Sequence, residues 1–163
     1  MRKEVSSKIG ARGEWYLVVQ AILFLLFIFG PHRCQWLADW QPPFTWIGSL
    51  AGVLLLLTGS ILALFGALSL GRNLTPLPHP KAGGTLIENG AYRLVRHPIY
   101  SGIIFMAFGW GLWLNSWLSI GYAILLFAFF DIKSRFEESL LSERFPQYAA
   151  YKDRVRKLLP FIY

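Results

Sequence analysis

One stretch of the sequence, YRLVRHPIYSG, gathers side chains that could bind a charged ligand. Arg96 and His97 come directly before Pro98, which suits the first turn of a helix because its missing N–H would be unpaired there. The two side chains therefore lie at the positive end of a helix dipole, where an anion binds favourably. Tyr100 and Gly102 fall in the first turn, and a glycine there lets another backbone or a flat ligand approach closely. Taken one by one, these residues also fit a simpler role as interfacial anchors and packing positions.

A pair of acidic residues further along the chain is the second candidate for chemistry. On a helix, Glu137 shares a face with Leu140 and Leu141, so we expect its carboxylate to point toward an apolar contact. Glu138 has Arg135 three residues before it, and an exposed ion pair between them is its simplest interpretation. A carboxylate held near apolar surface requires a cationic partner, which either the protein or a ligand can supply.

The sequence offers little for metal or redox chemistry. Cys34 is the only cysteine, which excludes an internal disulfide and a multi-cysteine metal site. The histidines His32, His79 and His97 lie in different segments and lack the two-histidine helical spacing of a metal site. We therefore expect no metal centre.

These side chains must be positioned by a chain that is too apolar for a soluble domain of its size. Of its 163 residues, 55% are hydrophobic and only 15% are charged, and the mean hydropathy is +0.44. Backbone groups in lipid must be paired within the segment, so the apolar stretches are predicted to be helices. We expect an all-α integral membrane bundle of about four transmembrane helices, with helices at 15–29, 44–70, 99–114 and 117–130.

The first of these helices could instead be the apolar core of a secretion signal, because basic residues precede it. The sequence that follows it, GPHRCQW, has no small-x-small cleavage pattern. A retained helix is therefore favoured.

Basic residues predict the orientation of the bundle. Fifteen of the sixteen lysines and arginines fall before the first helix, between the second and third, or after residue 130, and only Arg33 falls on the other side. We expect both termini to be cytoplasmic, in a protein of the bacterial inner membrane. The net charge of +7 is explained by this topology and by anionic lipid, and we expect no nucleic-acid partner.

The connections complete a single membrane domain over 1–163, divided into a two-helix region at 1–70 and a ligand-binding loop, hairpin and C-terminal segment at 71–163. The 31–43 connection should lie outside, with Trp36 and Trp40 at the lipid interface. The loop between the second and third helices is predicted to be ordered. The C-terminal segment has the pattern of one or two amphipathic cytoplasmic helices broken near Pro146.

Three stretches, NLTPLPHP, LIENGAYRLVRHPIYSG and FEESLLSERFPQYAAYKDRVRKLLPFI, resemble the isoprenylcysteine carboxyl methyltransferase family, whose relatives include membrane phospholipid N-methyltransferases. The similarity covers roughly 70–162. It is specific because the arginine-histidine-proline run, the glutamate pair and the closing L-P-F-I occur in the right order around a short helical hairpin.

The resemblance implies a methyltransferase that depends on S-adenosylmethionine and takes a lipophilic acceptor from the bilayer. On chemical grounds, the candidate catalytic residues are Arg96, Glu137 and Arg135. One of the arginines could orient a carboxylate acceptor, whereas an amine or thiol would give its proton to His97 or a glutamate. The family's eukaryotic members have a larger N-terminal half, so substrate choice does not carry over. The cofactor-binding residues implied by the motifs are Tyr92, Val95, Arg96, His97, Tyr100, Gly102, Glu137 and Glu138.

Two other functions compete with this interpretation. A non-enzymatic scaffold or lipid-binding protein could have the same architecture. A membrane reductase that uses NADPH could occupy a related bundle, although no G-x-G-x-x-G run supports it. The oligomeric state stays open.

Overall fold

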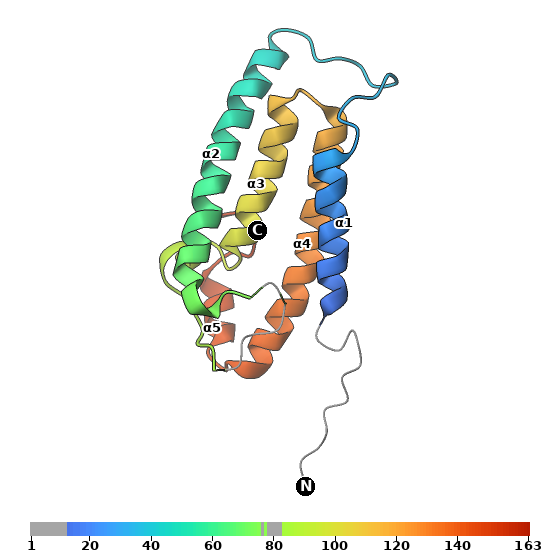
Figure 1. The fold of residues 1–163 in the computed structure, drawn as a ribbon. Helices are drawn as coiled ribbons and strands as arrows, with labels where there is room; N and C mark the ends of the chain where they lie inside the picture. The colour runs from blue at the N-terminus through green and yellow to red at the C-terminus, as the bar shows by residue number, and fades with distance from the viewer. Residues whose placement is uncertain (1–12, 76, 78–82) are drawn as a thin grey trace.

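A computed structural model of the chain describes residues 13–75, 77 and 83–163. The basic residues before the first helix, His79 and Lys81 lie outside this described part. Figure 1 shows helices that run side by side along one long axis, with a short helix at one end. The described residues contain no β-strand, which confirms the all-α prediction. The elements are α1 (Glu14–Phe29), α2 (Phe44–Leu70), η1 (Gly71–Asn73), η2 (Gly90–Arg93), α3 (Pro98–Trp113), α4 (Trp117–Arg144) and α5 (Tyr148–Arg154).

The long helices carry apolar side chains on their outer surface, as a lipid environment requires. On α2, for example, Leu57, Ile61 and Leu64 are all more than half exposed. A helix that is apolar on every face has no side to turn toward water. Two segments are long and apolar enough to cross a bilayer: α2 continued by η1, and α4. Helices α1 and α3 are shorter, with 16 residues each.

Helix α4 is longer than the sequence predicted. The expected end at residue 130 is wrong, because the helix continues to Arg144 and stops only before Pro146. Pro146 cannot continue a helix, and α5 follows it, so the predicted break is confirmed. Lys133, Glu137 and Glu138 consequently lie on one membrane helix and not in a segment after it.

Glycines let α2 and α3 approach closely along their length. A Cβ atom built on Gly102 would lie only 2.5 Å from the carbonyl oxygen of Gly59, and one built on Gly52 would lie 2.6 Å from that of Gly109. Small residues at such contacts allow backbone-to-backbone packing between membrane helices. Gly102 therefore faces α2, and the structure places another backbone there rather than a ligand.

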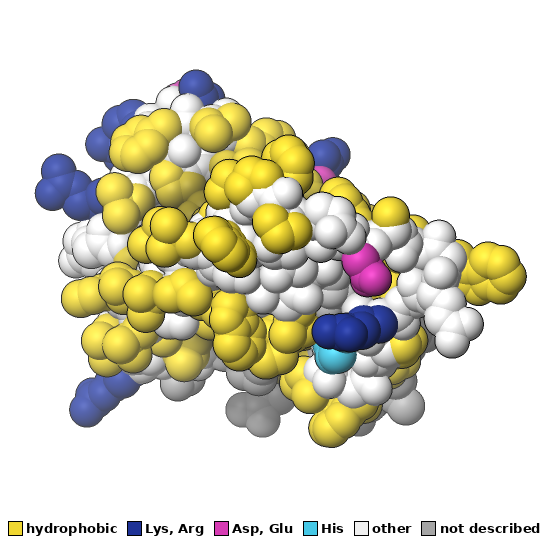
Figure 2. Space-filling model, turned by 90° about the horizontal axis from the view of Figure 1, so that it is seen from above, with side chains coloured by type: hydrophobic (Ala, Val, Ile, Leu, Met, Phe, Trp, Pro, Cys, Tyr) yellow, Lys and Arg dark blue, Asp and Glu magenta, His cyan; other side chains and the backbone are white. Residues whose placement is uncertain are grey.

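The other half of the bundle pairs α1 with α4, as Figure 1 shows. The buried core joins the two halves around Ile104 and Ala107 of α3 and Leu126 and Phe130 of α4. At the end that carries the 31–43 connection, Trp40 packs against Trp117 with ring centroids 4.8 Å apart. Figure 2 looks onto this end and shows mostly apolar side chains with few charged groups among them.

Candidate active site

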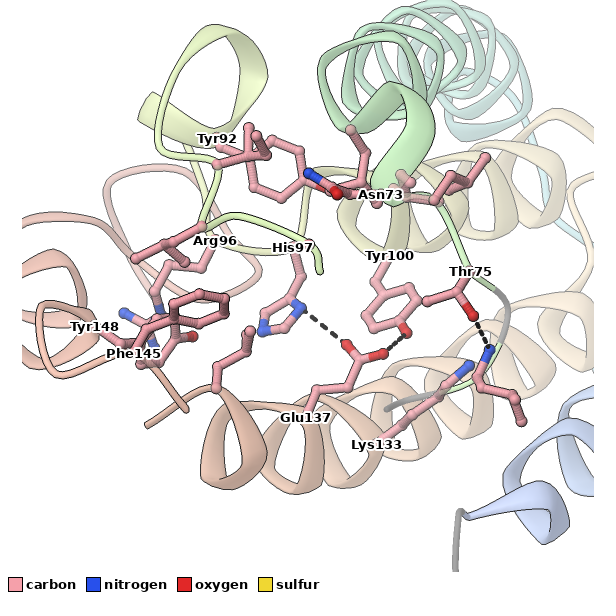
Figure 3. Close-up of a pocket in the computed structure, with 18 of the residues that line it drawn as sticks. Asn73, Thr75, Tyr92, Arg96, His97, Tyr100, Lys133, Glu137, Phe145 and Tyr148 are labelled. Atoms are coloured by element: carbon pink, nitrogen blue, oxygen red, sulfur yellow. Dashed lines mark hydrogen bonds and ion pairs between the residues drawn. The ribbon is translucent and has the colours of Figure 1, made fainter. Parts of the chain in front are cut away.

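A cavity of about 380 Å³ opens at the opposite end of the bundle, where α3 begins. Ligand pockets in proteins commonly have volumes of this order. Figure 3 shows polar side chains from the loop before α3, from α3 itself and from α4 converging on it. The polar residues that line it are Gln20, Asn73, Thr75, Thr85, Tyr92, Arg96, His97, Tyr100, Lys133, Glu137, Tyr148 and Tyr151.

His97 lies between the two glutamates of α4. Its Nδ1 is 3.4 Å from Oε2 of Glu137, and its Nε2 is 3.2 Å from Oε1 of Glu138. Pro98 begins α3 directly after it, so the imidazole projects from the helix N-terminus. The Tyr100 ring is stacked parallel to the imidazole, and its hydroxyl donates a hydrogen bond of 2.7 Å to Oε1 of Glu137. The sequence motif and the glutamate pair are thus brought together.

The two carboxylates favour the charged form of His97. Burial lowers the pKa of the imidazole, but the contacts with Glu137 and Glu138 outweigh burial and raise the pKa above its ordinary value. Each ring nitrogen faces a carboxylate oxygen, and a protonated imidazole can donate to both. The geometry therefore favours the imidazolium form of His97.

On one side of the pocket, the guanidinium group of Arg96 is held by partners within the protein. Its Nε donates to Oε1 of Glu138 at 2.8 Å, and its Nη1 donates to the backbone carbonyls of Lys152, at 3.0 Å, and Val155. The side chains of Arg96 and Glu138 are only 8% and 6% exposed. The expected exposed ion pair between Glu138 and Arg135 is therefore wrong, because Glu138 lies on the buried side of α4 and holds Arg96.

Three other residues of the predicted site do not line the cavity. Arg135 is 67% exposed and pairs with Asp131 at 2.8 Å. Val95 is fully buried, and its backbone forms an isolated parallel β-bridge with Arg156. Val95 thus joins the loop before α3 to the C-terminal segment. Gly102 packs against α2, as described above. Glu138 is likewise absent from the lining and reaches the pocket only through His97 and Arg96.

Lys133 and Gln20 line the cavity although the sequence analysis did not single them out. Lys133 is only 2% exposed, and its ammonium group donates a hydrogen bond of 2.7 Å to Oε1 of Gln20 on α1. The ammonium also lies 5.1 Å from the centre of the Tyr100 ring. A signal was present, since Lys133 is four residues before Glu137 and so shares its helical face. It was missed because the helix was expected to end at residue 130.

Tyrosines form the wall on the side of α5. The rings of Tyr148 and Tyr151 are 5.7 Å apart, and the Tyr151 hydroxyl donates a hydrogen bond of 2.7 Å to the backbone carbonyl of Tyr92. Burial raises the pKa of Tyr92, Tyr148 and Tyr151 well above the ordinary value, so these hydroxyls stay protonated. Neutral aromatic faces beside an acidic group can bind a cation.

Aliphatic side chains close the rest of the cavity. Ile99 and Ile103 of α3 face it from one side, and Leu141, four residues after Glu137, faces it from α4 as predicted. The cavity thus joins a charged end to an apolar wall. Within the described part of the chain, no group of three or more histidine, cysteine or acidic residues could hold a metal ion.

Comparisons with known proteins show which family the chain resembles. Residues 47–148 match the family described as phospholipid methyltransferase. A probable protein-S-isoprenylcysteine O-methyltransferase of rice, Oryza sativa subsp. indica, is 32% identical over 121 residues, which are 72% of this chain and 63% of the relative. Protein-S-isoprenylcysteine O-methyltransferase B of Arabidopsis thaliana is 31% identical over 72% of this chain and 61% of its own length.

A bacterial relative and a solved structure extend the comparison. The cobalt-zinc-cadmium resistance protein CzcN of Cupriavidus metallidurans is 29% identical over 91% of this chain and 62% of its own length. The structure of the eukaryotic intramembrane Ras methyltransferase ICMT matches with a TM-score of 0.64 at 23% identity, over 92% of this chain and 53% of that one. The chain thus spans less than two thirds of the length of the relatives it matches. By this match over most of its helices, the chain belongs to the phospholipid methyltransferase family.

Proposed function

We propose that this protein is a membrane methyltransferase that uses S-adenosylmethionine to methylate a carboxylate on a lipophilic acceptor. The observation that carries the proposal is the position of Glu137. Its carboxylate is held by His97 and Tyr100 in a cavity that joins a charged end to an apolar wall. Family membership supports the class of reaction.

The residues around the cavity fit the charges of this cofactor. Its sulfonium and ammonium groups are cationic, and Glu137 with the faces of Tyr92 and Tyr148 offers negative charge and aromatic surface to them. Its carboxylate requires donors, which the amide of Asn73 and the hydroxyl of Thr85 can supply. When bound, the cofactor supplies an activated methyl group for an in-line nucleophile. The protein contributes alignment in a site shielded from water, which can lower a barrier by several kcal/mol.

The acidic side chains and the imidazole of the site already have protein partners, and this favours a carboxylate as the methyl acceptor. A carboxylate attacks without losing a proton, whereas an amine with a pKa of about 10 must first be deprotonated. His97 has both ring nitrogens against carboxylates, and Glu137 already accepts from Tyr100. Among the described residues that line the cavity, no acid or imidazole without a protein partner is present to take the proton.

Lys133 is suited to orient the acceptor. Its buried ammonium lies beside the Tyr100 ring and is held by Gln20 from α1. A carboxylate that comes from the bilayer would replace the neutral amide acceptor of this hydrogen bond by an anionic one, so that the ammonium pairs with an opposite charge. This role replaces the one that the sequence analysis gave to Arg96 or Arg135, because Arg96 is committed to Glu138 and Arg135 lies outside the cavity.

The acceptor and the orientation of the protein belong to the same proposal. The names of the plant relatives favour a lipid-modified cysteine with a free carboxylate. Access from the bilayer is supported by the aliphatic wall of the cavity and by the lipid-facing surface of α2. The basic residues Arg72, Arg93 and Lys152, at the same end as the cavity, support a cytoplasmic location for that end in a bacterial inner membrane.

A second candidate acceptor is the amine of a phospholipid headgroup, because the family description names phospholipid. One experiment separates the two. Native membranes that contain the protein are incubated with S-adenosylmethionine labelled in its methyl group, and the lipid-soluble product is treated with mild alkali. A methyl ester releases labelled methanol, as we expect, whereas an N-methyl group keeps its label. Membranes with the Glu137→Gln variant serve as the control and should give no labelled product, while label in neither arm would contradict methyl transfer.

A further inference from the structure

A charged cluster that does not line the cavity ties the C-terminal segment to α4. Asp131 of α4 pairs with Lys157, accepts a hydrogen bond of 2.9 Å from the Tyr163 hydroxyl and pairs with Arg135. The ammonium of Lys157 also lies 4.7 Å from the centre of the Tyr163 ring. The side chains of Asp131 and Lys157 are 15% and 8% exposed, so their pair is largely shielded from water. We call Asp131 and Lys157 the clamp pair.

The backbone of the same C-terminal segment holds the residues that enter the cavity. The amide of Arg96 donates to the carbonyl of Arg156 at 2.8 Å, and the amide of His97 donates to the carbonyl of Lys157 at 3.2 Å. Leu158, the next residue, is fully buried in the core. Lys157 therefore binds His97 through its backbone and α4 through its side chain.

This double attachment links the two halves of the candidate site. His97 enters from the segment before α3, and Glu137 enters from α4, only six residues after Asp131. Since Lys157 contacts both halves, the clamp pair fixes how far His97 lies from α4. A displacement of His97 by about 1 Å would break its contact of 3.4 Å with Glu137, and misplacement on this scale is costly at reacting centres.

We propose that Asp131 and Lys157 are positioning residues that set the geometry of His97 and Glu137 and thereby the affinity for the cofactor. The proposal rests on the proposed function for its binding readout. Neither residue touches the cavity, so their effect acts entirely through the backbone of the C-terminal segment. Loss of Asp131 removes the anion that pairs with the shielded ammonium of Lys157, and loss of Lys157 leaves Asp131 with the exposed Arg135 as its cationic partner, so either change weakens the attachment.

The experiment compares four variants of the full chain in detergent. Lys157→Met and Asp131→Asn break the clamp pair, and Lys157→Arg keeps its charge. Asp153→Asn is the matched control, since Asp153 is exposed on α5 and undergoes the same chemical change as Asp131. Calorimetry measures the affinity for S-adenosylhomocysteine. Hydrogen exchange measures, without any ligand, how well the amides of residues 96 and 97 are protected.

We expect Lys157→Met and Asp131→Asn to bind about tenfold more weakly, equivalent to about 1.4 kcal/mol, and to lose protection at residues 96 and 97 while the α2 and α3 amides keep theirs. Lys157→Arg and Asp153→Asn should stay within about twofold of the wild type. Unchanged affinity in both clamp variants, or an equal loss in Asp153→Asn, would overturn the proposal.

The ligand-free hydrogen exchange distinguishes failure of the positioning role from failure of the proposed function. If the wild-type protein binds no S-adenosylhomocysteine, the proposed function fails, and local loss of protection alone then decides whether the clamp pair positions His97. If Lys157→Met does not fold, Asp131→Asn decides the matter, because asparagine has nearly the shape of aspartate. Exchange that accelerates equally along the whole chain would contradict a positioning role.

Discussion

Glu138→Gln should lower the stability of the protein much more than Glu137→Gln. Glu138 is 6% exposed and lies against Arg96 at 2.8 Å and His97 at 3.2 Å, with Lys152 at 3.7 Å. Among the described residues, Glu138 is the carboxylate that pairs with Arg96, and Glu138→Gln removes its charge. Loss of one partner from a buried ion pair costs about 3–5 kcal/mol. We take the lower end, about 3 kcal/mol, because Arg96 keeps its backbone carbonyl acceptors.

The same replacement one residue earlier provides the matched control. Glu137 is 17% exposed, faces the cavity and contacts Tyr100 and His97. Glu137→Gln can keep the hydrogen bond from Tyr100, so its loss of stability should be small. Its loss of cofactor affinity should be large, because the charge that faces the cationic ligand disappears.

Thermal unfolding in detergent, followed by circular dichroism, checks the contrast. With about 2–4 °C per kcal/mol for a chain of this size, the Glu138→Gln midpoint should fall by roughly 6–12 °C. The Glu137→Gln midpoint should stay within about 3 °C of the wild type. Calorimetric titration with S-adenosylhomocysteine should detect no binding to Glu137→Gln. Equal midpoints for the two variants, or a larger fall for Glu137→Gln, would refute the division of roles.

Three further outcomes follow from the same structure. Gly102→Ala should destabilise the protein by about 1–3 kcal/mol, because the added Cβ would meet the Gly59 carbonyl. Gly121→Ala places its Cβ in open space and should stabilise the protein by up to about 1 kcal/mol. Chemical unfolding measures both free energies. Lys133→Met should raise the KM of the acceptor at least about tenfold and leave cofactor affinity unchanged, as steady-state kinetics can show. Burial lowers the pKa of His97, but Glu137 and Glu138 outweigh burial and raise the pKa. The stability that the His97 charge contributes is therefore complete below about pH 6.5 and is lost as pH rises through the folded pKa. Unfolding midpoints between pH 6 and 9 should therefore fall more for the wild type than for His97→Gln, and parallel curves would contradict this.

Local signals in the sequence were sufficient to place most of the fold. The apolar stretches and the prolines predicted where α2 and α3 begin and that the chain breaks near Pro146, because missing N–H groups act on the backbone directly. The end of α4 was predicted wrongly. Asp131 and Lys133 resemble the polar edge of a membrane helix, yet the tertiary structure shields both and lets the helix continue for fourteen residues beyond 130.

The candidate site was predictable in its motifs but not in its partners. Glu137 was placed correctly beside Leu141, because helical periodicity determines which residues share a face. The commitment of Arg96 to Glu138, and the packing of Gly102 against α2, depend on contacts between segments far apart in the chain. Such contacts leave no periodic signal in a single sequence. Lys133 and Gln20 meet for the same reason only in the folded bundle.

The central claim is that His97 and Glu137 form a binding site for a sulfonium cofactor beside the lipid. Calorimetric titration of the folded wild-type protein with S-adenosylhomocysteine tests it most directly, with NADPH as a competitor. We expect one saturable site that NADPH does not displace and that Glu137→Gln abolishes. Folded protein that binds no S-adenosylhomocysteine, or that releases it to NADPH, would contradict the account.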